Sequence, residues 1–433
     1  MDSIHIQGGI PLSGVVKIAG AKNATLPLMT AALLTDEPLI LSNVPSLMDI
    51  TSLSNLLKDL GQHISEDYEP FQASPFLKNR TLTLHTPTIT NQKASYDLVR
   101  KMRASILVLG PLLARTGEAF VSLPGGCAIG TRPVNIHIKA LEHLGAHITL
   151  ENGYIHATAP KGLKGGEFTF PMVTVTGTEN LIMAACLAQG TTCLRNAARE
   201  PEISDLIRCL IKMGADIEGV GTDTLIIKGV SRLKGAHHSV IPDRIEFGTY
   251  AIAAAITRGE LTLIGADTAL LPSFLPKLEE IGVRITEVPE GLKVSGKDFS
   301  FKGVEIITDP FPGFPTDLQA QIMTLLCIAE GNSRITETIF ENRFMHVPEL
   351  MRMGANISIQ GNTVTTQGVS HLIGAEVMAT DLRASFSLVL GGLIARGTTI
   401  VNRVYHLDRG YEYVEDKLTA CGAQIKRIKP ASK

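Results

Sequence analysis

A sixfold internal repeat constrains the fold of this chain more than any other feature of its sequence. A short segment recurs as LGQHI, LGAHI, MGADI, IGVRI, MGANI and CGAQI, at intervals of 68 to 84 residues. Its glycines are Gly61, Gly145, Gly214, Gly282, Gly354 and Gly422. Each glycine follows an amphipathic run and precedes alternating residues, which is typical of a helix C-cap leading into a strand. The chain is therefore expected to contain six similar supersecondary units.

A second signature lies upstream in every unit. It reads LLTDEPLIL, LARTGEAFVSL, LAQGTTCL, ITRGELTLI, IAEGNSRIT and IARGTTIV, and its centres are Asp36, Gly117, Gly190, Gly259, Gly331 and Gly397. Each unit thus reads as helix, strand, helix, strands. Because one such unit cannot bury its own faces, we expect three units to pack together in each of two domains. A length of 433 residues agrees with two domains.

The domain boundaries are less clear from the pattern than the repeats are. The segment KGAHHSVIPD is loop-like and predicts one boundary near Gly235 to Pro242. The opening segment SIHIQGGIPLSGVVKIAG reads as strands but has no matching partner in the first unit. From the pattern alone, these strands could pair with either half of the chain.

Composition excludes several classes of function. A net charge of −2 argues against a generally basic nucleic-acid surface. The N-terminal MDSIHIQGG does not resemble a signal peptide, and ASILVLGPLLA is too short to span a bilayer. The six cysteines show no CxxC spacing and the twelve histidines no HExxH pattern. We expect a cytoplasmic protein with reduced thiols, no metal, and neither a nucleic-acid nor a membrane partner.

The repeat also brings chemically distinctive residues into one register. Fourteen residues before the centre of each upstream signature stand Lys22, Arg103, Thr176, Ile245, Asp317 and Arg383, each near the start of a predicted helix. Cations at a helix N-terminus work against the helix dipole. Their recurrence favours a role in ligand binding, although a solvated helix end is the alternative for any one of them.

The loops after the upstream strands supply a second set of candidates. Arg343 and Arg409 each lie twelve residues beyond the glycine of their unit, and Cys127 and Arg132 occupy the corresponding loop LPGGCAIGTRP. A thiol in a glycine-bounded loop near a cation can have a tuned pKa, whereas a plain turn is the alternative. If helix starts and loops face a common cleft, the arginines would suit a polyanion because guanidinium forks bind two oxygens at once.

Nine motifs together carry a resemblance to a known family. They are AGAKNA (19–24), RKMRAS (100–105), LPGGCAIGTRPVNIH (123–137), AAREPEI (197–203), PDRIE (242–246), FPTDLQAQ (314–321), ENRFMHVPEL (341–350), ATDLRAS (379–385) and DRGYE (408–412). With them the chain resembles, from end to end, the UDP-N-acetylglucosamine enolpyruvyl transferases of the EPSP synthase superfamily. The resemblance implies an inside-out α/β prism of two three-repeat domains, residues 22–241 and residues 1–21 with 242–433, with the active site in the cleft between them.

The reaction that the resemblance implies is transfer of the enolpyruvyl group of phosphoenolpyruvate to the 3′-hydroxyl of UDP-N-acetylglucosamine. It releases phosphate through a tetrahedral intermediate, needs no cofactor or metal, and is the first committed step of peptidoglycan synthesis, which links it to cell shape and division. The carried-over roles make Cys127 the acid that protonates phosphoenolpyruvate and the target of fosfomycin, and make Asp317 either the base or only an orienting group. Lys22, Arg132 and Arg409 would hold phosphoenolpyruvate, with Asn23 and Arg383 orienting the reacting groups.

The nucleotide sugar would be contacted from several separate segments. By resemblance, the contacting positions are Arg103, Arg132, Pro133, Val134, Asn135, Ile136, Thr174, Val175, Thr176, Asp317 and Ile339. Arg343 is a further candidate for substrate binding, from the register of the repeats. This chain has Thr176 and Gly177 where members of the family often have glycine then alanine, and Asn135 where aspartate is frequent. Glycines at 125, 126 and 130 would let the Cys127 loop close as a lid over the substrates.

Two other interpretations compete with this one. The shikimate-pathway enolpyruvyl transferase shares the fold and phosphoenolpyruvate, but it has no GGC loop of the kind found in LPGGCAIGTRP. A catalytically weak relative could instead act as a nucleotide-sugar sensor or a partner of wall-synthesis proteins. The presence of Cys127, Asp317, Lys22 and Arg409 favours an active enzyme.

Overall fold

The computed structural model describes residues 2–71, 74–123, 134–297 and 300–429. They form two compact units, which divide between Ala19 and Gly20 and between Ile241 and Pro242. The described residues of 20–241 are called the continuous unit, and residues 2–19 together with 242–429 the split unit. Each unit has its own core of buried apolar side chains.

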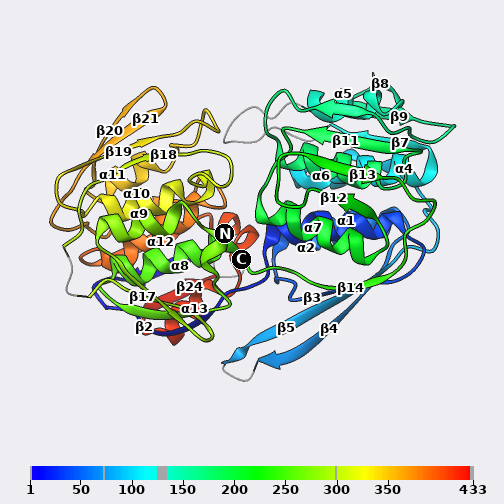
Figure 1. The fold of residues 1–433 in the computed structure, drawn as a ribbon. Coiled ribbons are helices and arrows are strands. Elements are labelled where there is room, and N and C mark those ends of the chain that lie inside the picture. Colours follow the sequence, from blue (N-terminus) through cyan, green and yellow to red (C-terminus); the bar gives the residue numbers. More distant parts are fainter. Residues whose placement is uncertain (1, 72–73, 124–133, 298–299, 430–433) are drawn as a thin grey trace. The chain divides into compact units, whose positions relative to one another are not determined.

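The described part of the continuous unit contains three four-stranded sheets with one common topology (Figure 1). The first, in spatial order, is β14 (Ala236–Ser239), β3 (Leu39–Ser42), β5 (Ser74–His85) and β4 (His63–Phe71). The second is β6 (Lys93–Ala94), β7 (Glu118–Ser122), β9 (Tyr154–Thr158) and β8 (His147–Glu151), and the third is β10 (Glu167–Thr169), β11 (Thr191–Arg195), β13 (Leu225–Lys228) and β12 (Asp216–Glu218). In each sheet the first strand is parallel to the second, and the other pairs are antiparallel.

The described part of the split unit repeats this topology. Two sheets are β2 (Ser13–Lys17), β15 (Glu260–Ile264), β17 (Gly291–Ser295), β16 (Arg284–Val288), and β18 (Glu305–Ile307), β19 (Asn332–Thr336), β21 (Thr363–Gln367), β20 (Asn356–Gln360). The third is β22 (Glu376–Met378), β23 (Thr398–Asn402), β1 (Ser3–Gln7) and β24 (Gln424–Ile428). Both opening strands therefore pair with the C-terminal half: β2 runs parallel to β15, and β1 lies antiparallel between β23 and β24.

Apolar helices fill the inside of each unit. They are α1 (Lys22–Ala31), α4 (Leu109–Thr116) and α6 (Val175–Ala185) in the continuous unit, and α8 (Arg244–Ile256), α10 (Gln319–Leu326) and α12 (Ala384–Ile394) in the split unit. Helix α6 contacts α1 and α4, and α8, α10 and α12 contact one another. A helix that is apolar on all sides is stable only when it is buried. The predicted fold class, with helices inside a prism of sheets and three repeats per unit, is confirmed (Figure 1).

Amphipathic helices complete the repeats and end as the sequence predicts. They are α2 (Met48–Asp59), α5 (Asn135–His143), α7 (Pro201–Lys212), α9 (Phe274–Ile281), α11 (Val347–Arg352) and α13 (Val414–Ala420). The six predicted glycines follow them, and all have φ between 89° and 111°. Only glycine adopts this left-handed backbone without strain, so the predicted C-caps are confirmed.

The hairpin of the first repeat is longer than its sheet requires. Strand β5 pairs with β3 only over Leu82–Leu84, yet β4 and β5 remain paired from His63 opposite His85 to Pro70 opposite Lys78. The outer residues therefore form a two-stranded ribbon that extends beyond the sheet (Figure 1).

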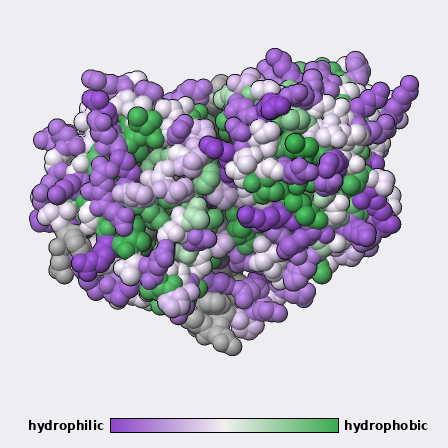
Figure 2. All heavy atoms as spheres, viewed as in Figure 1, coloured by the Kyte–Doolittle hydropathy of each residue, from purple (hydrophilic) through white to green (hydrophobic). Residues whose placement is uncertain are grey.

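The surface in view is largely hydrophilic, with small separate apolar patches (Figure 2). The exposed large apolar side chains come from many different elements; examples are Tyr96, Leu150, Met172 and Ile307. Within the described ranges, no helix combines the length and the apolar character that crossing a membrane would need.

Candidate active site

The six residues of the predicted register lie at or beside the starts of the inner helices, as the sequence predicts. Lys22 is the first residue of α1, Thr176 the second of α6 and Ile245 the second of α8. The other three stand in or beside short helical turns that lead into α4, α10 and α12: Arg103 begins η2 (Arg103–Val108), Asp317 is the second residue of η4 (Thr316–Leu318), and Arg383 is the N-cap of α12.

In the split unit, Asp317 is held between two arginines. Arg343 Nη2 donates to Asp317 Oδ1 at 2.7 Å, and Arg383 Nε lies 3.6 Å from Oδ2, within ion-pair reach. The arginine side chains are 5% and 2% exposed and that of Asp317 is 25% exposed. Burial lowers the pKa of Arg343, but the charges of Asp317 and Asp381 outweigh it and raise that pKa overall. The partly exposed carboxylate of Asp317 is thus held by two buried guanidinium groups.

Arg383 connects Asp317 to a residue that the sequence analysis did not single out. Its Nη2 lies 3.5 Å from Asp243 Oδ2, and its Nη1 donates to the carbonyl oxygen of Gly410 at 3.1 Å. Asp243 also caps α8, since its Oδ1 accepts from the N–H groups of Ile245 and Glu246. At this helix start it is therefore Asp243 that joins the contacts around Arg383, whereas Ile245 is buried in the core. The spacing of Asp243 and Glu246 is that of a helix-capping pattern and could have indicated it.

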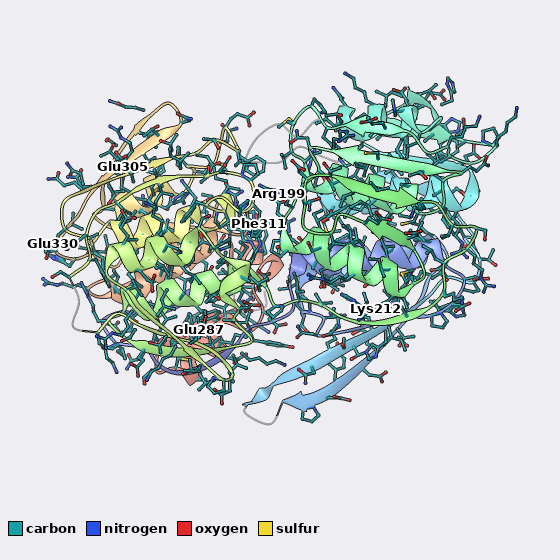
Figure 3. The ribbon with its side chains drawn as sticks, viewed as in Figure 1. Arg199, Lys212, Glu287, Glu305, Phe311 and Glu330 are labelled. Carbon is teal, nitrogen blue, oxygen red and sulfur yellow. The ribbon has the colours of Figure 1, made fainter. Side chains whose placement is uncertain are left out.

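The neighbouring Arg244 points elsewhere. Its guanidinium lies 5.9 Å from the centre of the Phe311 ring, which Figure 3 labels in the split unit. At the start of α8 it is Asp243 that lies within ion-pair reach of Arg383, at 3.5 Å. The carboxylate of Asp243 thus offsets the charge of a buried arginine.

A buried polar cluster fixes the backbone of Asp317. The Tyr411 hydroxyl lies 2.9 Å from Thr249 Oγ1, and Gln321 Nε2 donates to Tyr411 at 3.0 Å. The same amide nitrogen donates to the carbonyl oxygen of Asp317 at 2.9 Å. Burial raises the pKa of Tyr411 to about 12, so its hydroxyl stays protonated. The cluster ties η4 to α8 and to the segment after Arg409.

Two further predicted residues of the split unit, Ile339 and Arg409, are linked to Asp317 through other residues. The N–H of Ile339 donates to Glu337 Oε1 at 2.8 Å, and Glu337 Oε2 accepts from the hydroxyl of Thr316, which precedes Asp317. Arg409 ends η5 (Val404–Arg409) and directly precedes Gly410, whose carbonyl binds Arg383. Ile339 is thus linked to Asp317 through Glu337 and Thr316, and Arg409 through Gly410 and Arg383.

In the continuous unit, Lys22 is held at the start of α1. Its Nζ lies 3.4 Å from Asp49 Oδ2, and both side chains are buried. Asn23 beside it is half-buried. A lysine kept in one place by a carboxylate is a fixed point charge, which is what binding of a small anion requires.

Arg103 and Thr176 come together around a histidine that the sequence analysis did not identify. His137 Nε2 lies 3.4 Å from Thr176 Oγ1. Burial, together with the charge of Arg103, lowers the pKa of His137 to about 4, so the ring is neutral at pH 7. Thr174 caps α6, because its hydroxyl oxygen accepts from the N–H of Gly177. Nothing in the motif LPGGCAIGTRPVNIH distinguishes this histidine as a buried hydrogen-bonding group.

Some of the remaining predicted residues lie within the described structure and others do not. Val134 is buried, Asn135 is the exposed first residue of α5, Ile136 is half-buried, and Val175 begins α6. Cys127, Arg132 and Pro133 lie outside the described residues. The cleft predicted to combine residues of both units stays a prediction.

The described cysteines and acidic residues do not form a metal centre. Over the described ranges, no group of three histidine, cysteine, aspartate or glutamate residues could hold a metal ion. Burial raises the pKa of Cys186, Cys209 and Cys327 to about 12, which fits the expectation that they are core residues.

Known proteins resemble this chain over almost its whole length. The family model described as EPSP synthase (3-phosphoshikimate 1-carboxyvinyltransferase) matches residues 6–418. The UDP-N-acetylglucosamine 1-carboxyvinyltransferase of Paramagnetospirillum magneticum is 59% identical over 429 residues, covering 99% of each chain. That of Dinoroseobacter shibae is 58% identical over 429 residues, covering 99% of this chain and 100% of the relative.

Solved structures share the fold at low sequence identity. The enolpyruvyl transferase NikO from Streptomyces tendae has a TM-score of 0.86 at 24% identity and covers 99% of both chains. An EPSP synthase from Acinetobacter baumannii has a TM-score of 0.75 at 17% identity and covers 99% of this chain and 100% of that one. Both likenesses extend over the complete two-unit architecture.

Proposed function

The chain belongs to the UDP-N-acetylglucosamine 1-carboxyvinyltransferase family, and on that premise we propose that it transfers the enolpyruvyl group of phosphoenolpyruvate to the 3′-hydroxyl of UDP-N-acetylglucosamine. Phosphate is released, and the product enters peptidoglycan synthesis in the cytoplasm. The observation that carries this proposal is Asp317 held between Arg343 and Arg383 at the start of an inner helix.

The proposed chemistry is an addition followed by an elimination. In the addition, the Cys127 thiol gives a proton to the methylene carbon of phosphoenolpyruvate, and the sugar hydroxyl oxygen bonds to the adjacent carbon. In the elimination, the bond from that carbon to the phosphate oxygen breaks, phosphate leaves with the electron pair of that bond, and the methyl group returns a proton to the Cys127 thiolate. Asp317 accepts the hydroxyl proton or orients the hydroxyl. A carboxylate whose orientation is fixed by two arginines is suited to either task.

The arginines of the split unit divide into two roles. Arg343 and Arg383 are almost fully buried and already bind Asp317, Asp243 and the Gly410 carbonyl. We assign them to orienting Asp317. Arg409 is half-buried, and with Lys22 and Arg132 it is assigned to the phosphate and carboxylate of phosphoenolpyruvate.

We assign the nucleotide sugar to the start of α6 and to the other positions that the family resemblance implies. The assigned residues are Arg103, Arg132, Pro133, Val134, Asn135, Ile136, Thr174, Val175, Thr176 and Ile339. The contact between Thr176 and His137, and the effect of the Arg103 charge on His137, support grouping Arg103 with the α6 start. An arginine near a helix N-terminus favours an anionic group such as a diphosphate.

Phosphate release tests the proposal directly. We expect release from phosphoenolpyruvate that depends on UDP-N-acetylglucosamine in the parent protein and collapses in Cys127→Ala and Asp317→Asn. Cys193→Ala changes a half-buried cysteine elsewhere in the continuous unit and serves as the matched control. Binding of the nucleotide sugar without turnover in the parent would instead support a sensor.

Fosfomycin supplies an independent test of the thiol. The epoxide should add to Cys127, and intact-mass measurement should show one adduct on the parent and on Cys193→Ala but none on Cys127→Ala. An unmodified parent would contradict the assignment of Cys127 as a reactive group.

A further inference from the structure

A chain of hydrogen bonds in the continuous unit begins at α4 and ends at the hydroxyl of Thr176. Its first link fixes the side-chain amide of Asn180, a buried residue of α6. The N–H of Gly110 donates to Asn180 Oδ1 at 2.6 Å, and Asn180 Nδ2 donates to the carbonyl oxygen of Ile106 at 2.9 Å. A backbone N–H can only donate and a carbonyl oxygen can only accept, so the amide has one orientation.

The close approach of α4 makes this first link specific to glycine. A Cβ atom on Gly110 would lie 2.4 Å from the Asn180 carbonyl oxygen and 2.5 Å from Asn180 Oδ1. A side chain at position 110 would therefore push the two helices apart and break the bond that orients the amide.

The second link sets the tautomer of His137. Asn180 Nδ2 lies 3.1 Å from His137 Nδ1, so the amide N–H faces this ring nitrogen and Nδ1 must accept. The low pKa of His137 keeps the ring neutral at pH 7, and a neutral imidazole carries its single hydrogen on the other nitrogen. His137 is therefore the Nε2–H tautomer, with both of its nitrogens in defined roles.

The third link reaches Thr176. With the hydrogen on Nε2, His137 donates to Thr176 Oγ1, 3.4 Å away. The described residues make no other hydrogen bond to this hydroxyl, and Thr176 is half-buried. The hydroxyl hydrogen of Thr176 is consequently available to an acceptor that is not part of this hydrogen-bond chain. Thr174 cannot serve in the same way, because its hydroxyl is the cap of α6.

We propose that Thr176 donates its hydroxyl hydrogen to an anionic oxygen of the diphosphate of the nucleotide sugar, and that Asn180 and His137 are positioning residues that keep it a donor. This inference rests on the proposed function, which places the nucleotide sugar at the start of α6. The charge of Arg103, which acts on the same histidine, favours an anionic oxygen as the acceptor.

Calorimetric titration with UDP-N-acetylglucosamine tests the donor. Thr176→Val keeps the shape of the side chain and removes the hydroxyl, so the dissociation constant should rise about tenfold or more, while Thr176→Ser should stay within about twofold of the parent. The KM for phosphoenolpyruvate should not change. Thr169→Val removes an exposed hydroxyl of β10 in the same unit and should match the parent.

The positioning roles of Asn180 and His137 are tested by a measurement that does not respond to a loss of packing alone. Nitrogen-15 NMR of the parent without ligand should show His137 protonated at Nε2 and bare at Nδ1. In Asn180→Asp the carboxylate can only accept, so the hydrogen should move to Nδ1, and Nε2 would then take the Thr176 hydrogen. The affinity should fall as in Thr176→Val, with no further loss in the double variant.

The outcomes separate this inference from the proposed function. A parent that binds UDP-N-acetylglucosamine while Thr176→Val binds it equally well overturns the donor role. A parent His137 protonated at Nδ1 overturns the positioning chain, and this measurement needs neither ligand nor the Asn180 variant. A parent that neither binds nor turns over the nucleotide sugar overturns the proposed function and, with it, the ligand named here.

Discussion

Arg427 binds Asp408 through both of its terminal nitrogens, with Nη1 2.9 Å from Oδ2 and Nη2 2.6 Å from Oδ1. The Nε of the same guanidinium donates to Glu415, and Nη1 lies 3.7 Å from Asp2. Such a two-pronged contact fixes the direction of the carboxylate as well as its distance. Asp408 directly precedes Arg409, so a residue of β24 determines where the end of η5 is held.

We therefore expect Arg427→Met to act on the phosphoenolpyruvate site through Arg409. The KM for phosphoenolpyruvate should rise about tenfold because a misplaced binding group loses orientation, while the KM for the nucleotide sugar should hold. Steady-state kinetics with each substrate varied in turn measure both. Arg195→Met, which breaks the exposed pair with Glu167 in the other unit, is the control. Equal increases in both KM values would count against a role through Arg409.

Gly177 and Thr174 are expected to be coupled. A Cβ on Gly177 would lie 2.5 Å from Thr174 Cγ2 and 3.1 Å from Oγ1, so alanine there forces the threonine to turn and release its cap. Gly177→Ala should cost about 1 kcal/mol of unfolding free energy. The double variant Thr174→Ser/Gly177→Ala should recover most of it, since serine lacks the methyl group. Chemical denaturation of the parent, the two single variants and the double variant gives the unfolding free energies. Additive effects of the two substitutions would refute the coupling.

His346 should make stability fall on acidification. It is fully buried, and its ring nitrogens have no hydrogen-bond partner among the described residues. Burial lowers its pKa to about 4, whereas the unfolded chain takes up the proton near pH 6.5. Between these values the unfolded state binds more protons, so the contribution is present above pH 6.5 and is lost as the pH falls toward 4, by roughly 3 kcal/mol.

The difference between parent and His346→Gln isolates this contribution from the other titrating groups. Unfolding free energies at pH 7, 6, 5 and 4 should fall less steeply in the variant than in the parent. His237→Gln, which changes an exposed histidine, should keep the slope of the parent. A parent and variant with the same slope would exclude His346 as the cause.

The ribbon beyond the first sheet should be dispensable for folding. Replacing residues 70–78 by Asn-Gly closes the hairpin on the pair of Glu69 and Asn79 and leaves the pairing of β5 with β3 unchanged. Because every pair between β3 and β5 is kept, the melting temperature should stay within about 2 °C of the parent. Leu82→Ala, in the buried part of β5, should instead cost about 2–5 kcal/mol. Calorimetry that shows the shortened protein unfolding much earlier would mean that the ribbon supports the unit.

The sequence predicted backbone positions better than it predicted side-chain partners. The helix-ending glycines and the helix starts of the register follow from local signals, which is why the six φ values and the position of Asp317 agree with expectation. The pairing of Asp243 with Arg383 joins residues 140 positions apart. It depends on how three repeats pack around one another, and the spacing of the repeats does not contain that information.

The same limit applies to His137. Its neutrality arises from burial and from Arg103, and its tautomer from Asn180, three residues that the fold brings together from separate segments. A histidine in a loop motif gives no sign of these surroundings. By contrast, Asp243 could have been found, because its spacing to Glu246 is a local capping signal. The roles of Cys127 and Arg132 stay predictions.

Strand β1 lies beside β24 with Ser3 opposite Ile428, so the polypeptide returns in the last sheet to the place where it set out. The first strand is therefore hydrogen-bonded to the last strand in one sheet. A circular permutant that joins the two ends and reopens at the Asn152–Gly153 turn between β8 and β9 would keep every strand pair described here. In that permutant the 20–241 unit would be the interrupted one, so which unit is split depends on the position of the cut and not on the architecture.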